Sequence, residues 1–154
     1  MKRLSILWLG LSLCLACQPS LERVLPRQTG TWQIRQLVYE YIRANDRIDR
    51  LDSTQVGQVV FAENERAELY ALAGDSLRLV DEWTWLVPNE GEITLSFGQL
   101  SFGGEQTFTF EVLDNRRHEQ LWRAEKPLTV YDPLRRDSVQ ARILLQMALE
   151  RVAN

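Results

Sequence analysis

The two cysteines of the chain are the side chains with the strongest potential for covalent chemistry. Cys14 and Cys17 lie three residues apart in the stretch LSLCLACQPS. Such a pair could form a disulfide, hold a metal ion as thiolates, or serve another purpose. The preceding residues indicate a location, because a basic start at Lys2 and Arg3 is followed by an apolar run over residues 4–16. This pattern is typical of a secretory leader, and the run is shorter than the roughly 20 residues of a membrane-spanning helix.

The end of this leader is similar to a bacterial lipobox. The sequence LAC at residues 15–17 precedes the polar Gln18. The resemblance implies that residues 1–17 are a lipoprotein signal peptide, that Cys17 is lipidated and becomes the mature N-terminus, and that Cys14 is discarded. It implies a lipid-anchored protein of the bacterial cell envelope. The outer membrane is favoured, because Gln18 is not the aspartate that retains some lipoproteins at the inner membrane. A plain signal peptide and an uncleaved anchor are the alternatives.

No other residue pattern points to catalysis. His118 is the only histidine and lies in the charged run NRRHEQ, and neither G-x-S-x-G nor H-E-x-x-H occurs. Paired acidic residues at 63/65 and 81/82 are expected on the surface. We therefore predict no enzyme, no catalytic residue, no metal site and no cofactor. Removing Lys2 and Arg3 from the 18 basic residues leaves 16 against 21 acidic ones, so no nucleic-acid partner is expected.

The elements that must position any site are mostly short strands. Residues 18–29 contain two prolines and no sustained periodicity, which predicts a short tether. From residue 30 to residue 131, apolar and polar residues alternate between turn-rich breaks, which favours an antiparallel meander. A bulge near Gln36 would reconcile the two registers of the first strand. A solvated loop is predicted at 44–54, and the eight predicted strands cover residues 32–41, 56–62, 67–72, 76–87, 92–97, 107–112, 118–124 and 127–131.

After residue 131 the pattern changes. Asp132 is a good N-cap, Pro133 suits the first helical position, and the residues that follow are helix formers without Gly or Pro. We predict a C-terminal α-helix over residues 132–154, whose apolar stripe would pack on the outer surface of the sheet. The predicted fold is therefore mainly β, an eight-stranded antiparallel up-and-down barrel over residues 30–131 followed by this helix.

The opening of the first strand resembles the G-x-W signature of lipocalins. It reads Gly30-Thr31-Trp32, and the likeness is nearer still to small lipocalin-like lipoprotein domains of bacterial envelopes, which carry a Phe on the second strand and a Trp on a middle strand. Phe61 and the pair at 83 and 85 occupy those places, and the resemblance covers about residues 29–131.

This resemblance implies a lipocalin-like barrel with one closed and one open end. Gly30 and Trp32 would form the plug of the closed end, with Arg123 as the arginine that packs on the tryptophan. The open end would take a small hydrophobic molecule.

The aromatic side chains admit two interpretations, because an eight-stranded barrel is just wide enough to be filled by side chains or to hold one small ligand. If a cavity exists, we expect Tyr39, Trp83, Trp85 and Phe97 to line it. The main functional hypothesis is thus a membrane-anchored lipoprotein that binds a small hydrophobic ligand. The alternative is a filled barrel that acts through its rim on another envelope protein, as an inhibitor or assembly accessory.

Overall fold

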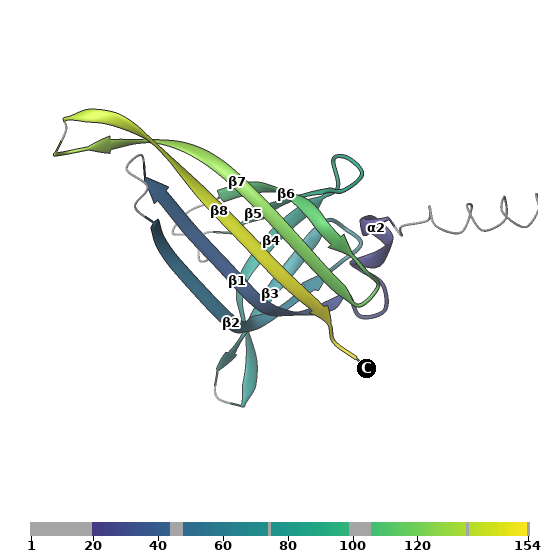
Figure 1. The fold of residues 1–154 in the computed structure, drawn as a ribbon. Coiled ribbons are helices and arrows are strands. Elements are labelled where there is room, and N and C mark those ends of the chain that lie inside the picture. The colour runs from purple at the N-terminus through teal and green to yellow at the C-terminus, as the bar shows by residue number, and fades with distance from the viewer. Residues whose placement is uncertain (1–19, 44–47, 74, 99–105, 135, 154) are drawn as a thin grey trace, which may run out of the picture.

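The chain forms a closed barrel of eight antiparallel strands in chain order. The structure is a computed structural model, and it describes residues 20–43, 48–73, 75–98, 106–134 and 136–153. A single short helix, α2 (Leu21–Val24), precedes the barrel in this part of the chain (Figure 1). The strands are β1 (Thr31–Arg43), β2 (Ile48–Phe61), β3 (Arg66–Ala73), β4 (Ser76–Leu86), β5 (Glu92–Phe97), β6 (Gln106–Asn115), β7 (Glu119–Asp132) and β8 (Asp137–Arg151).

The predicted alternation produces the barrel wall. In β5, Ile93, Leu95 and Phe97 are buried while their neighbours are half-exposed. In β1 the register of pairing to both neighbouring strands shifts between Ile34 and Gln36, which confirms the predicted bulge. The bulge lets Trp32 and Ile34 before it, and the residues at 37 and 39 after it, face the same core.

The predicted C-terminal helix is wrong, because residues 137–151 form β8, the eighth strand of the barrel. Two of the predicted strands, 118–124 and 127–131, are instead one continuous strand, β7. Pro127 lies within β7 at a position where pairing to β6 has already ended. The strand needs no N–H donor on that side, so a proline is tolerated there. The eight strands predicted over residues 30–131 are therefore seven, and β8 completes the set.

Two further expectations need correction. Most of the predicted loop at 44–54 belongs to β2, which begins at Ile48 and pairs with β1, whereas residues 44–47 lie outside the described part. The expected tether does not extend over residues 20–29. There α2 and the residue after it bury Leu21, Val24 and Leu25 against the barrel core, so this segment is part of the domain. The predicted signal peptide and Cys17 also lie outside the described residues.

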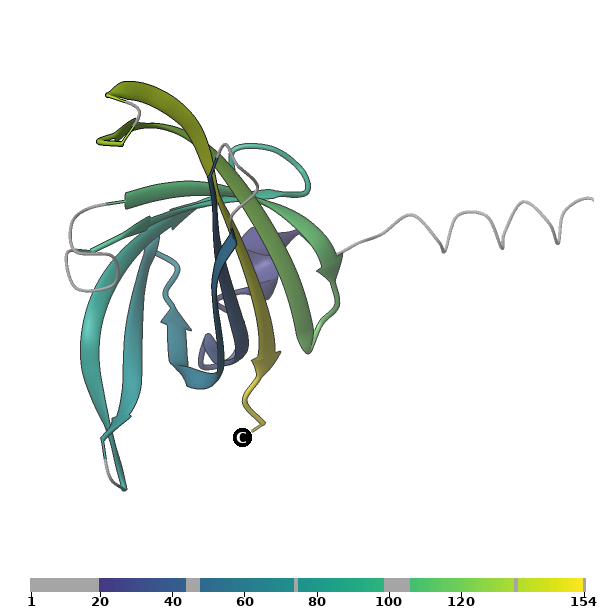
Figure 2. The same cartoon turned by 60° about the vertical axis from the view of Figure 1, so that its left-hand side comes forward.

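Strand pairing is complete around only one end of the barrel in the described part of the chain. β2 pairs with β3 only within residues 58–61, β4 with β5 only within 84–86, and β6 with β7 only within 111–115. Beyond these positions the wall divides into the four-stranded sheet β2-β1-β8-β7 and the two-stranded hairpins β3-β4 and β5-β6. Figures 1 and 2 show the β7–β8 and β3–β4 hairpins diverging from each other, so the barrel flares toward this open end.

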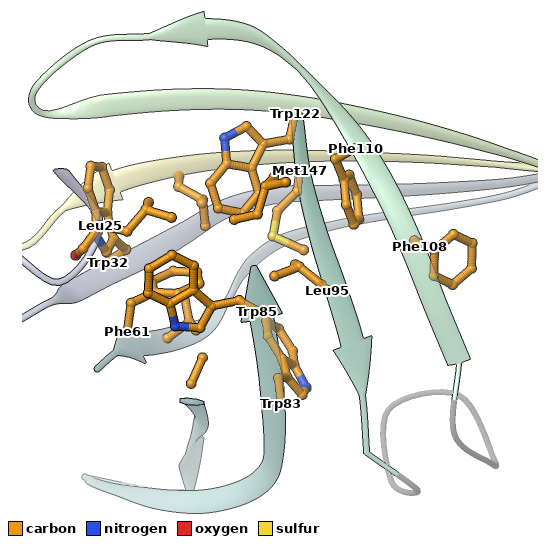
Figure 3. Packing of buried hydrophobic residues seen from close by; sticks show 14 of the residues in the cluster. Leu25, Trp32, Phe61, Trp83, Trp85, Leu95, Phe108, Phe110, Trp122 and Met147 are labelled. Carbon is orange, nitrogen blue, oxygen red and sulfur yellow. The ribbon is translucent and has the colours of Figure 1, made fainter. Parts of the chain in front are cut away.

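The core fills the narrow part of the barrel with aromatic rings. Phe61 makes edge contacts with Trp85 and Trp122, at centroid distances of 5.8 and 6.0 Å. Leu95 and Met147 pack between the rings, both almost fully buried (Figure 3). Packing of this kind, which excludes water from large apolar surfaces, holds the fold together.

Candidate functional site

The closed end is sealed by Trp32 and an arginine. The Trp32 side chain is fully buried, and its Nε1 donates a hydrogen bond of 3.0 Å to the backbone oxygen of Leu25. The Arg151 guanidinium lies over the indole ring, 4.3 Å from its centroid. It also donates to three backbone carbonyls, those of Val24, of Arg27 at 2.6 Å and of Arg117 at 3.1 Å. Arg151 thus fastens the N-terminal segment and the β6–β7 turn to the barrel.

Arg123 does not take the role that the resemblance implied for it. Its neighbours Trp122 and Ala124 point into the core, so alternation places Arg123 on the outer surface, where 48% of its side chain is exposed. Its guanidinium lies 4.0 Å from the Glu125 carboxylate on the same face. Arg151 was not identified from the sequence as the partner of Trp32, because a helix was predicted for the residues of β8. Only in a strand does Arg151 fall in the series of alternate residues that face inward. Burial, with Arg27 and Arg117 nearby, lowers the pKa of Arg151 from its ordinary value, but a guanidinium stays charged.

Gly30 brings two strands together at the closed end. Its φ is +64°, and a Cβ here would overlap the backbone oxygen of Phe61. The Phe61 N–H donates to the Gly30 carbonyl at 2.9 Å. A side chain would therefore separate β1 from β2 at the base of the barrel.

Three of the four predicted ligand residues belong to the packed core. Trp85 lies near the closed end, where its Nε1 donates to the carbonyls of Ala62 and Arg66 at 3.2 and 3.1 Å. Trp83 and Phe97 are 4% and 2% exposed and touch edge to face at 4.7 Å between centroids. Because these rings fill the interior, they could form only the floor of a ligand site at the open end, and not its walls.

Asp81 supports that floor and is not a surface carboxylate as predicted. It is 7% exposed and accepts hydrogen bonds of 3.1 Å from Trp83 Nε1 and from the Glu82 N–H. A Cβ at Gly98 would overlap its carboxylate, so the close approach of β4 and the end of β5 needs glycine there. The carboxylate fixes the orientation of the Trp83 indole.

Tyr39 is the predicted ligand residue that lies above the core and is half-buried. It faces inward on the four-stranded sheet, where register places it in one cross-strand row with Ala124, Leu145 and Leu51. The next row toward the open end consists of Lys126, Ile143, Tyr41 and Asp49. Burial, with a contribution from Tyr41, raises the pKa of the Tyr39 phenol above its ordinary value.

Exposed apolar side chains gather at the same end. Of the nine large apolar residues that are exposed in the described part, seven lie on the hairpin ends that form the open rim: Ile48, Leu51, Leu72, Leu77, Leu79, Tyr131 and Leu134. Leu51 is 61% exposed and faces inward, opposite Tyr39. No pattern in the sequence could have separated this rim from the core, because both carry inward apolar residues at every second position.

Two surface grooves lie at the closed end, beside α2. One has a volume of about 840 Å³ and is lined by charged residues that include Glu22, Arg27 and Glu65. The other, about 480 Å³, lies against the β4–β5 turn and includes Pro88 and Asn89. The first groove carries charges of both signs, whereas the charged residues of the second, Glu22 and Glu90, are both acidic.

Within the described residues, no three His, Cys, Asp or Glu side chains are grouped as a metal ion would require. The same part of the chain contains no helix of the length and apolarity needed to cross a bilayer. No protein-family profile matches the sequence, and no curated protein matches it significantly. The architecture and the side chains of the open end are therefore the basis for a functional assignment.

Proposed function

We propose that the protein is a lipocalin-like lipoprotein of the bacterial envelope that binds a small apolar molecule at the open end of its barrel. The observation that carries the proposal is the contrast between the two ends. The closed end is filled by rings and sealed by Trp32 and Arg151, whereas the open end keeps an inward apolar face that is only half-buried. Apolar surface left partly in water at the mouth of a barrel favours a ligand that covers it.

The lipid anchor would orient this mouth. Cys17 precedes Ser20 by three residues, a distance of at most about 10 Å in an extended chain. Ser20 leads directly into α2, which packs at the closed end. An acylated Cys17 would therefore hold the closed end at the membrane surface and direct the open end away from it. Mass spectrometry of the mature protein from native membranes, with Cys17→Ser as the control, tests the anchor.

Ligand binding is tested with a neutral probe and two matched variants on β2. The probe is 12-bromo-1-dodecanol, whose bromine quenches tryptophan fluorescence on contact. Leu51→Asp places a charge on the inner face of the mouth, whereas Ile48→Asp places one on the outer face of the same strand, and both positions are more than half exposed. We expect the wild type and Ile48→Asp to bind alike, and Leu51→Asp to bind at least about fivefold more weakly. Equal binding by both variants, or no quenching of the wild type, would contradict the proposal.

A protein-interaction role is the second candidate, and one surface favours it. Tyr70, Leu72, Leu77 and Leu79 share one face of the β3–β4 hairpin, because Tyr70 pairs with Leu79 and Leu72 with Leu77. The three leucines are between 45% and 71% exposed. Mild crosslinking in cells followed by purification, compared between wild type and Leu72→Glu, tests this role. A crosslinked partner that the substitution removes would support it.

A further inference from the structure

Lys126 occupies an unusual position on the inner face of the mouth. β7 points residues 120, 122 and 124 into the core, so Lys126 continues the inward series and is half-buried. Its register partner on β8 is Ile143, which also packs against the core. The ammonium lies where pairing between β6 and β7 has ended, and it spans that seam.

The partners of this ammonium are all neutral. The Lys126 Nζ lies 3.2 Å from Gln106 Oε1 and 3.5 Å from the Thr107 carbonyl oxygen, and 5.2 Å from the centroid of the Phe108 ring. No carboxylate of the described residues lies within 4.0 Å of it. An ammonium has three donors and a full charge, and neutral acceptors satisfy the donors without neutralising the charge.

Two other cations on the inner surface of the described residues are already held by the protein, Arg43 by a carboxylate and Arg151 by three backbone carbonyls. Arg43, further along the same sheet, has Asp49 at 2.9 Å, and Arg151 is committed to the closed end. Lys126 is also the only lysine after residue 17, where all the other residues of the Lys/Arg type are arginines. A lysine carries a compact charge on a flexible stem, so it can follow an anion of varied shape, which a rigid guanidinium does less well.

We propose that the ligand of the open end is a single-chain amphiphile with an anionic head group, bound with its charge at Lys126 and its alkyl chain along Tyr39 and Ile143. This inference rests on the proposed binding function and specifies its ligand class. The alkyl chain covers the half-buried side chains of Tyr39 and Ile143, while the head group supplies the charge that the neutral partners of Lys126 do not. A carboxylate and a phosphate share this chemistry.

The experiment compares three amphiphiles with the same twelve-carbon chain: 1-dodecanol, dodecanoate and dodecyl phosphate. Each competes with 12-bromo-1-dodecanol for the full mature protein, below the concentration at which micelles form. We expect the wild type to bind at least one of the anions about tenfold more tightly than the alcohol. The stronger of the two anions identifies whether a carboxylate or a phosphate is preferred.

Variants then locate the preference. In Lys126→Met the preference for the anion over the alcohol should fall to within about twofold. Arg123→Met removes the same charge from the outer face of the same strand and should keep the preference. Lys126→Arg keeps the positive charge and should keep part of the preference for the anion. This variant shows whether the preference depends on the charge or on the shape of the lysine side chain.

Four results would overturn the inference. Equal affinities of the wild type for alcohol and anions would show that no charge is recognised, while the binding function itself would stand. A preference that persists in Lys126→Met, or one that is lost in Arg78→Met on the β3–β4 hairpin, would place the anion elsewhere. Failure of all three amphiphiles to compete would remove both the inference and the function on which it rests.

Discussion

Replacing Arg151 by methionine should destabilise the protein more than any single exposed substitution. The side chain is 8% exposed and stacks on Trp32. Its guanidinium donates to the backbone carbonyls of Val24, Arg27 and Arg117. Methionine replaces the aliphatic part of the side chain but not the guanidinium, so the substitution removes the charge, the hydrogen bonds and the stacking on Trp32.

The magnitude follows from the carbonyls left behind. A buried polar group that loses its partner costs about 1–3 kcal/mol, and an arginine over a tryptophan contributes about 1 kcal/mol more. The desolvation cost of the guanidinium, which methionine avoids, offsets part of this loss. We therefore expect the free energy of unfolding to fall by about 3–5 kcal/mol, a large fraction of the 5–15 kcal/mol typical of a domain. The melting temperature should fall by about 10–15 °C.

Urea denaturation followed by tryptophan fluorescence measures this difference. Arg123→Met is the matched control, because it removes the same group from the half-exposed outer face of β7 and should change the free energy of unfolding by less than about 0.5 kcal/mol. Limited proteolysis should also cut Arg151→Met earlier within residues 20–29, which Arg151 holds. If the two variants were equally stable and equally resistant, Arg151 would not fasten the N-terminal segment.

Three further substitutions test other parts of the barrel. Gly30→Ala should cost at least about 3 kcal/mol in urea denaturation because its Cβ overlaps a β2 carbonyl, whereas Gly91→Ala, also at positive φ but with open space around it, should cost only about 1 kcal/mol. Trp85→Phe should cost about 1–3 kcal/mol by the same assay, since two carbonyls lose their Nε1 donor; a loss below about 0.5 kcal/mol would contradict this. A raised pKa in the folded state means that the unfolded chain ionises first, so Tyr39 contributes stability that is lost as pH rises above about 10. Between pH 8 and 11 the melting temperature should therefore fall less steeply for Tyr39→Phe than for the wild type. Tyr131→Phe, at an exposed position, is the control.

Alternation predicted the strands well wherever one face of a strand is buried and the other is wet. β5 and the first half of β6 have this form, and their predicted bounds agree with the structure to within a few residues. The bulge in β1 was also predictable, because the apolar phase of the sequence changes at residue 35 and only an extra residue restores the inward direction. These are local properties, and they need no knowledge of the rest of the fold.

β8 shows where local pattern is insufficient. Its residues, such as Leu144, Gln146 and Ala148, are good helix formers, and Asp132 with Pro133 resembles a helix start. The same segment also alternates, with Leu145, Met147, Leu149 and Arg151 inward. Closure of the barrel decides between the two, because a helix would leave the facing edges of β1 and β7 unpaired.

The location of the candidate site could not be predicted from the sequence for a related reason. Inward residues of the closed end and of the mouth follow the same alternation, so Trp85 and Tyr39 could not be distinguished from their spacing. What separates them is how far each strand pair extends, and pairing of β2 with β3, β4 with β5 and β6 with β7 ends early. The seam between β6 and β7 is where Lys126 lies. Lys126 therefore lies beside the apolar mouth because strand pairing is incomplete there. No single stretch of the sequence predicts where pairing between two strands ends.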